Sequence, residues 1–157
     1  MKSNVKFSKF SILLTTVITG VLFVGCVLTF DEKPTFYAIV FILAVLLLTS
    51  ALYAPVSVSV SDESVVIKSL LKKHKIPLSK IKDIELFQPT MGAIRICASG
   101  GYFGYWGLFC EKDIGRYIAF YGKASDCFLI ELHDGGKRVI GCKNPDVMCD
   151  YIKRRLI

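Results

Sequence analysis

Six cysteines and two histidines are the side chains of this 157-residue sequence that could bind a metal ion or take part in nucleophilic catalysis. Zinc sites normally bring their ligands in close pairs, and no Cys-x-x-Cys pair occurs here. His74 lies in a basic segment and His133 at the edge of a glycine turn, and neither has an obvious cysteine or serine partner. We therefore expect the cysteines to be buried as small hydrophobic residues, and we expect no metal, no cofactor and no enzymatic reaction.

Three glycines, Gly101, Gly104 and Gly107, raise the question of phosphate binding, because glycine-rich loops can cradle phosphates. No Lys-Ser or Lys-Thr pair follows them and no helix is predicted to open there, so the pattern fits neither a P-loop nor a dinucleotide-binding fingerprint. Further along the chain, Glu111 and Asp113 flank a lysine. We expect these charges to form a solvated cluster rather than a catalytic acid and base.

Aromatic residues alternate with these glycines in the stretch 99–107, which its composition predicts to be a loop. Tyr102, Phe103, Tyr105 and Trp106 are the candidate binding residues of this loop. If exposed, they would contact a protein partner or the membrane interface, since aromatic anchors dominate binding surfaces. If buried, they would fill the open end of a β-barrel. The sequence leaves both alternatives open.

Lys72, Lys73 and Lys75 are the sharpest electrostatic feature of a chain whose formal net charge is +7. In a turn that faces a membrane, they would contact anionic lipid headgroups, at roughly 1 kcal/mol for each lysine. The alternative is a solvated hairpin tip. The other positive charges are too dispersed for a nucleic-acid-binding arm, so no nucleic-acid partner is expected.

The elements that must position these residues begin with two apolar segments, 10–30 and 35–54, which contain no charged residue. Because about 20 residues of helix span the hydrocarbon layer, both segments are predicted to cross the bilayer. The short connector 31–34 makes them antiparallel neighbours, so residues 1–54 form a transmembrane hairpin. No ionisable side chain lies inside either segment, so the hairpin is predicted to be an anchor rather than a pore. Small residues, Gly20 and Ala44 among them, would allow self-association into a homo-oligomer.

The charges that flank the helices predict their orientation. Lys2, Lys6 and Lys9 precede the first helix without an acidic residue, whereas the connector is net negative, so the positive-inside rule places both termini in the cytoplasm. A lipoprotein signal ending at Cys26 is the alternative, and it would leave a lipidated cysteine outside. The second helix would still return the chain to the cytoplasm. We favour the uncleaved hairpin because the first apolar segment is longer than a usual signal core.

Residues 55–157 are predicted to form one cytoplasmic domain that begins without a linker. Alternation and β-branched content predict about seven short antiparallel strands, with the piece that contains Pro77 at a sheet edge. The eight candidate segments are 56–60, 65–71, 74–78, 81–87, 94–98, 115–121, 127–133 and 137–142. The spacing of Ile81 and Ile84 also allows a helical turn in 81–87, where we favour a strand. A final helix begins after Asn144, which can cap it. The apolar stripe of this helix is predicted to comprise Val147, Met148, Tyr151, Ile152 and Leu156.

Three motifs accompany this order of elements: Gly104-Tyr105-Trp106-Gly107, the segment 114–121, and Asn144-Pro145-Asp146 at the start of the last helix. With two preceding membrane helices, the chain resembles bacterial pleckstrin-homology-like (PH-like) membrane proteins over residues 55–157. The resemblance implies two near-orthogonal sheets closed by a C-terminal helix, in a multi-pass protein of the plasma (inner) membrane. The turn 61–64 is acidic where phosphoinositide-binding relatives carry lysines and arginines, so their usual pocket is not expected here.

Together these features predict a non-enzymatic, membrane-tethered interaction or scaffolding module. It would present a PH-like domain to a protein partner at the cytoplasmic face of the membrane. The alternative function is that of a sensor of anionic lipid headgroups or of a small ligand through the same domain. Salt would separate the two, since lysine-driven lipid binding weakens as ionic strength rises whereas aromatic protein contact persists.

Overall fold

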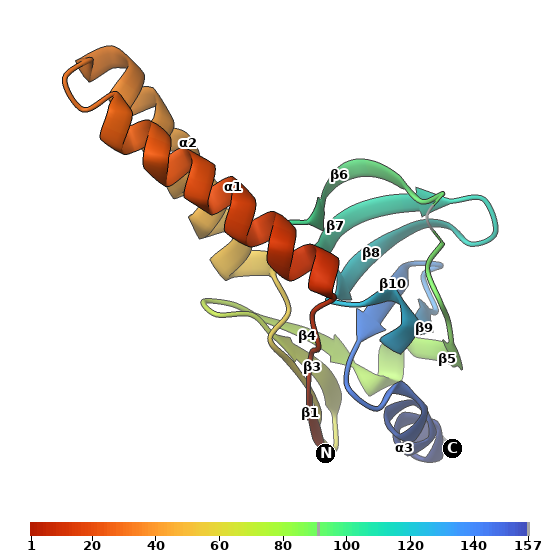
Figure 1. Ribbon diagram of the computed structural model, residues 1–157. Helices are drawn as coiled ribbons and strands as arrows, with labels where there is room; N and C mark the ends of the chain where they lie inside the picture. Colours follow the sequence, from red (N-terminus) through yellow and green to blue (C-terminus); the bar gives the residue numbers. More distant parts are fainter. Residues whose placement is uncertain (91, 157) are drawn as a thin grey trace.

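Two long helices form a hairpin that stands on a β-rich domain in the computed structural model, which describes residues 1–90 and 92–156 (Figure 1). Helix α1 spans Lys9–Leu28 and α2 spans Lys33–Tyr53. Ser8 caps α1, because its hydroxyl accepts a hydrogen bond from the Ser11 N–H at 3.1 Å. Both helices are long and apolar enough to cross a membrane, and their bounds lie within two residues of the predicted segments.

The first sheet has four strands in the order β1-β2-β3-β4. They are β1 (Lys2–Asn4), β2 (Ser57–Val60), β3 (Ser64–Lys68) and β4 (Lys73–Pro77). The predicted edge position of β4 is confirmed. The sequence does not predict β1, because its three polar residues show no alternation, yet β1 pairs antiparallel with β2. The segment before α1 therefore completes a sheet whose other strands follow α2, while the domain boundary after residue 54 stays a prediction.

The turn between β3 and β4 corrects a predicted boundary. The strand predicted to reach residue 71 ends at Lys68, because the Ser69 N–H donates to the Lys72 carbonyl at 2.8 Å and closes a tight turn. Leu70 and Leu71 occupy this turn and are 72% and 64% exposed. Lys73, which the sequence placed in the turn, lies within β4, and Lys75 lies in β4 within the predicted strand 74–78.

The second sheet has six strands in the order β5-β9-β10-β8-β7-β6. They are β5 (Ile81–Leu86), β6 (Ile94–Gly101), β7 (Gly104–Glu111), β8 (Gly115–Tyr121), β9 (Cys127–Leu132) and β10 (Lys137–Gly141). Strands β8 and β10 run parallel, so the sheet is not wholly antiparallel as predicted. The described residues form ten strands, more than the sequence indicates, since β1 and β7 add to the predicted set.

The prediction of a loop over residues 99–107 is wrong, because most of this stretch forms two strands. Strand β6 continues to Gly101 and β7 begins at Gly104, so only Tyr102 and Phe103 form the turn of a β-hairpin. The φ angles of Gly101, Phe103 and Gly104 are +131°, +49° and +89°. Two glycines supply the positive φ that this tight turn needs, and they therefore shape the hairpin instead of breaking its strands.

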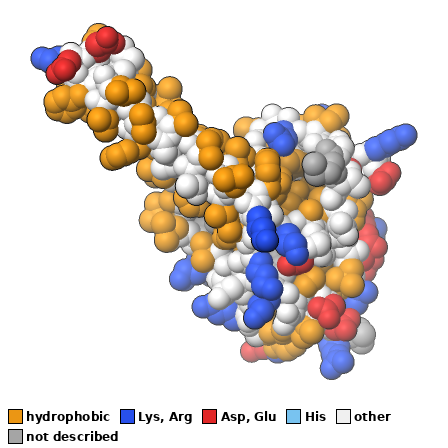
Figure 2. Space-filling view, in the orientation of Figure 1, with side chains coloured by type: hydrophobic (Ala, Val, Ile, Leu, Met, Phe, Trp, Pro, Cys, Tyr) orange, Lys and Arg blue, Asp and Glu red, His pale blue; other side chains and the backbone are white. Residues whose placement is uncertain are grey.

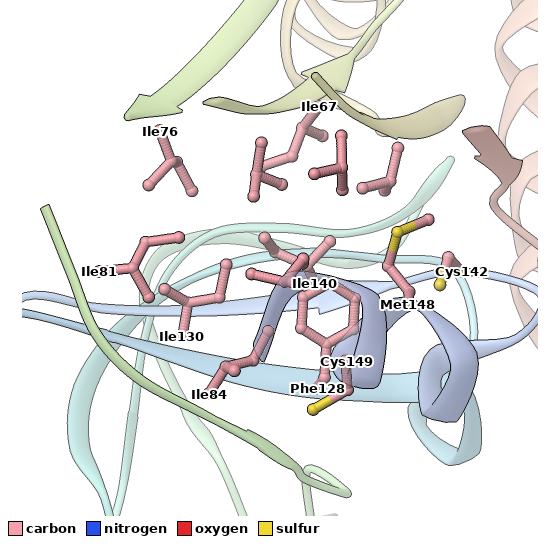
Figure 3. Close-up of a cluster of buried hydrophobic side chains, with 14 of the residues drawn as sticks. Ile67, Ile76, Ile81, Ile84, Phe128, Ile130, Ile140, Cys142, Met148 and Cys149 are labelled. Carbon is pink, nitrogen blue, oxygen red and sulfur yellow. The ribbon is translucent and has the colours of Figure 1, made fainter. Parts of the chain in front are cut away.

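The main apolar core lies between the two sheets and under the closing helix α3, which spans Pro145–Leu156 (Figure 3). Ile67 of β3 is fully buried in it, and α3 contributes Met148 and Cys149, which are 0% and 3% exposed. Val147 was predicted to lie on the buried stripe of this helix but is 48% exposed. Apart from that residue, the closing helix packs on the sheets as its sequence pattern predicts.

Candidate functional site

The turn of the β6–β7 hairpin is hydrogen-bonded to helix α1, which passes beside it (Figure 1). The Ser11 hydroxyl donates to the Gly101 carbonyl at 2.6 Å and accepts the Gly104 N–H at 2.9 Å. One helical turn further, the Thr15 hydroxyl accepts the Phe103 N–H at 2.9 Å. Ser11 is only 1% exposed, so this contact satisfies polar groups that would otherwise be buried without partners.

Tyr102 and Trp106 extend the contact to both helices. Tyr102 is 7% exposed, and its hydroxyl lies 3.2 Å from the Thr19 hydroxyl of α1. Trp106 donates its indole N–H to the Tyr102 carbonyl at 3.1 Å. Its ring stacks on Tyr53, the last residue of α2, with ring centroids 5.9 Å apart and an interplanar angle of 16°. Tyr102 and Trp106 thus both face the helical hairpin.

Tyr53 connects the two sets of residues that the sequence singles out. Besides stacking on Trp106, its ring lies 5.1 Å from the Lys72 Nζ and 5.7 Å from the ring of His74. An ammonium over a tyrosine ring contributes roughly 0.5–1 kcal/mol at an exposed site. The aromatic hairpin and the lysine segment, which lie far apart in the sequence, therefore meet at the end of α2. No local pattern in the sequence indicates these partners of Tyr53.

Tyr105 points away from the helical hairpin, whereas Phe103 lies beside it. Tyr105 stacks on Tyr121 of β8 at 4.9 Å, on the opposite face of β7 from Trp106, because successive side chains alternate along a strand. Phe103, in the turn, is 38% exposed. Tyr102 and Phe103 have ring centroids 5.1 Å apart, so Tyr105 is the candidate residue that lies apart from the others. Partner binding by these four residues stays a prediction.

The β3–β4 turn lies against the same end of α2. The Leu71 N–H donates to the Ala51 carbonyl at 2.9 Å, which holds the turn beside the helix. A mostly apolar recess of about 450 Å³ lies next to it, lined by Leu70, Ala54 and Phe103 among other residues. Figure 2 shows hydrophobic side chains along the helical hairpin and basic side chains on the domain below its base. Exposed leucines beside lysines suit contact with a membrane surface. The headgroup contact predicted for Lys72, Lys73 and Lys75 stays a proposal.

A family model for the bacterial PH domain matches residues 56–156. The chain belongs to the bacterial PH domain family. This match confirms the resemblance drawn from the sequence, and the fold agrees with it: two helices precede a PH domain of two sheets with a closing helix. No curated protein and no solved structure matches the chain significantly.

Within the PH domain, His74 of β4 is wedged between aromatic rings. Its ring centroid lies 5.7 Å from that of Tyr53 and 4.9 Å from that of Phe120, and its Nε2 lies 3.4 Å from the Leu52 carbonyl. Burial lowers the pKa of His74, the Leu52 carbonyl raises it in part, and the charge of Lys72 lowers it further. His74 therefore favours its neutral form and links β4 to the end of α2.

Three thiols of the PH domain, those of Cys127, Cys142 and Cys149, are buried, and burial raises the pKa of each. Protonated thiols are poor nucleophiles and poor metal ligands, which agrees with the hydrophobic role predicted for these residues. Cys97 is exposed, contrary to that prediction. Within residues 1–90 and 92–156, no group of three or more histidine, cysteine or acidic side chains is arranged to hold a metal ion.

Glu111 corrects the predicted solvated charge cluster, because it is 5% exposed. Its carboxylate accepts the Thr90 N–H at 2.8 Å and the Tyr117 hydroxyl at 3.3 Å. Burial raises the pKa of Tyr117, and the charge of Glu111 raises it further, so the tyrosine stays protonated as a donor. Glu111 thus ties the segment before β6 to β7 and β8, while Asp113 in the next turn is exposed.

Proposed function

We propose that this protein is a non-enzymatic module that fixes its PH domain against the cytoplasmic surface of a bacterial membrane and presents it there to a protein partner. The observation that carries the proposal is the attachment of the β6–β7 hairpin to both helices, through Ser11 and Thr15 of α1 and Tyr53 of α2. A domain bonded in this way has one orientation relative to its helices, whereas a domain on a flexible linker samples many. A fixed orientation suits the presentation of a binding surface at a defined distance from the bilayer.

The proposed topology rests on charge. Lys6 and Lys9 lie at the base of the helical hairpin, and Lys2 lies in β1 of the domain. The far tip carries Asp31, Glu32 and Lys33 and is net negative, and Figure 2 shows its acidic side chains. Positive charge marks the cytoplasmic side of membrane helices. This distribution supports a PH domain in the cytoplasm and a hairpin tip on the outer side of the inner membrane.

In-cell photo-crosslinking tests the proposal. A photoreactive residue would replace, one at a time, three exposed lysines from different parts of the domain: Lys73 of β4, Lys112 of the β7–β8 turn and Lys153 of α3. At least one position is expected to give a discrete protein adduct. Lipid adducts alone, or no adduct from any of the three positions, would contradict a protein-presenting role.

Headgroup sensing is the second candidate function, favoured by the β3–β4 turn. Leu70 and Leu71 are exposed beside Lys72 and Lys73, at the end of an apolar helix. Leucines can enter the acyl boundary while lysines meet phosphates. A photoreactive residue at Leu71 is expected to give lipid adducts whose yield falls with rising salt and in the Lys72→Glu/Lys73→Glu variant. If the yield of lipid adducts did not change with the anionic lipid content of the membrane, that result would count against this function.

A further inference from the structure

A groove of about 460 Å³ runs along the free edge of β4, where the two sheets of the PH domain separate. Strand β4 forms one rim over Lys73–Pro77, and Arg138 of β10 and Asp134 of the β9–β10 turn belong to the other. Apolar side chains, Ile118 and Phe120 among them, line the groove between the rims. The groove thus combines an open strand edge with an apolar floor.

The hydrogen-bond ladder of the β3–β4 hairpin decides which main-chain groups of β4 face this groove. The Ser69 N–H donates to the Lys72 carbonyl at 2.8 Å at one end, and the Leu78 N–H donates to the Glu63 carbonyl at 2.9 Å at the other. Both pairs belong to one register, in which hydrogen-bonded and non-hydrogen-bonded pairs alternate. Even-numbered residues of β4 therefore bond to β3, and odd-numbered residues direct their N–H and C=O groups away from it.

Lys73 and Lys75 are the odd-numbered residues of β4 whose N–H has no main-chain partner among the described residues, since Pro77 has no N–H. Their side chains lie on the exposed face of the strand, whereas those of His74 and Ile76 face the interior. An extended peptide laid along this edge would pair with Lys73 and Lys75 through its main chain. Its side chains would then alternate between the lysine face and the apolar floor.

The groove is also strongly cationic. Lys73, Lys75 and Lys80 are exposed along one side, and Arg138 is half-buried on the other. None of these four side chains forms an ion pair within the part of the chain that the structure describes. Burial lowers the pKa of Arg138, and the charge of Asp134 raises it in part. The Asp134 carboxylate also accepts the Gly136 N–H at 2.8 Å. A partner carboxylate would therefore meet several cations that lack a counter-ion.

We propose that an acidic segment of a partner protein binds in this groove in extended conformation, as an added strand on β4. The inference rests on the proposed function and specifies the chemistry of the partner. Residues two apart on a strand are about 7 Å apart, so acidic side chains at alternate positions would sit opposite Lys73 and Lys75. The residues between them would point over Phe120 and the rest of the floor. The expected recognition sequence is therefore an alternation of acidic and apolar residues.

An anionic headgroup is the competing occupant of a cationic groove. A headgroup site gathers donors around one point, as in the anion-binding concavities formed by successive N–H groups. Here Lys73, Lys75 and Lys80 follow one another along the chain. At Lys73 and at Lys75, the main-chain N–H and C=O groups also point toward the open edge of β4. Repetition along a line favours an extended chain over a headgroup.

Selection from a randomised peptide library, about nine residues long, against the full chain in lipid nanodiscs tests this inference. The enriched peptides are expected to alternate acidic and apolar residues. A synthetic consensus peptide should bind at least about tenfold more weakly to Lys73→Glu/Lys75→Glu. It should bind within about twofold of the original affinity to Lys112→Glu/Lys153→Glu, which carries the same charge change outside the groove. All four lysines are exposed, so both variants should keep the thermal midpoint of the parent protein.

Amide hydrogen exchange separates strand addition from simple charge attraction. Bound peptide should slow exchange at the Lys73 and Lys75 amides and leave the His74 and Ile76 amides, which already face β3, unchanged. Protection that spares Lys73 and Lys75 would overturn strand addition. A selection without enrichment of acidic residues would overturn the inference as a whole. So would a second result, in which Lys73→Glu/Lys75→Glu binds vesicles containing phosphatidylserine more weakly than the parent protein but binds every selected peptide equally well. The proposed function would survive those results if Lys112 or Lys153 still gave a discrete protein adduct.

Discussion

At the scale of single residues, His74 makes stability depend on pH. Its pKa is lowered, chiefly by burial, so protonation opposes the folded state. The stabilisation is fully present above the ordinary histidine pKa of 6.5 and is lost as the pH falls through the lower pKa of the folded protein. We expect the thermal midpoint in detergent micelles to fall between about pH 7.5 and about pH 5, and to fall less in His74→Gln.

His133 supplies the matched control for this prediction, because it is the other histidine and is exposed. Because the whole protein responds to pH, the informative quantity is the difference between variants. His133→Gln should retain the pH dependence of the parent protein. If His74→Gln retained all of it as well, the wedge of Tyr53 and Phe120 around His74 would not be what disfavours the protonated ring.

At the scale of elements, the bonds between α1 and the β6–β7 hairpin hold the domain to the helices. Ser11→Ala would leave the Gly101 carbonyl and the Gly104 N–H without their partner, which costs about 1–3 kcal/mol for a buried polar group. Trp106 is the only tryptophan and stacks on Tyr53, so its fluorescence reports the contact. We expect Ser11→Ala to shift its emission to longer wavelength and to lower the thermal midpoint.

Thr16 provides the control for that substitution. Its hydroxyl donates at 2.9 Å to the Ile12 carbonyl within α1 and is exposed, so Thr16→Val removes a helix-internal bond without touching the hairpin. The emission of Thr16→Val should match that of the parent protein. Equal emission and equal midpoints for Ser11→Ala and the parent would show that the hydrogen bonds of Ser11 do not hold the hairpin on α1.

The same scale shows how far the sequence can predict this structure. Length and apolarity predict both helices, and alternation predicts most strands, because these signals are local. Strand β7 is missed because its two glycines predict a loop, whereas Gly104 lies beside the hairpin turn and Gly107 lies within the strand. The contact of Ser11 with Gly101 and the stacking of Tyr53 on Trp106 leave no local pattern, since residues distant in sequence form them. The sequence is enough to name the candidate lysines and aromatic residues, but it does not predict that they meet at Tyr53.

Strand β1 carries a prediction of its own. The segment before α1 binds the domain through main-chain bonds, including Val5 N–H to the Val56 carbonyl at 3.0 Å and Lys143 N–H to the Asn4 carbonyl at 2.9 Å. Val5 is also buried, at 8% exposure. A fragment of residues 55–157 should therefore be destabilised, and a synthetic peptide of residues 1–8 should raise its thermal midpoint, by about 4–8 °C for each kcal/mol of binding. A scrambled peptide should not, and equal effects of the two peptides would contradict the role of β1.

At the scale of the whole molecule, the closing helix and the helical hairpin lie at opposite ends (Figure 1). The residues that attach the domain to the helices gather at one end, around Tyr53, and the cationic groove of the proposed partner begins at Lys73, close to the same point. Under the proposed topology, this end meets the membrane and α3 faces the cytoplasm. A partner segment in the groove would then be held beside the bilayer surface rather than far from it.

The depth of Trp106 tests this arrangement. Its ring stacks on the last residue of α2, so under the proposed topology it lies at the border between hydrocarbon and headgroups. In nanodiscs with brominated lipids, we expect stronger quenching by bromines near the glycerol end of the acyl chain than by bromines near its methyl end. The double variant Trp106→Phe/Tyr151→Trp moves the only tryptophan to α3 and should show little quenching by either lipid. If Trp106 were quenched as weakly as that control, the base of the hairpin would lie outside the bilayer, and neither the leucines of the β3–β4 turn nor the groove could act at its surface.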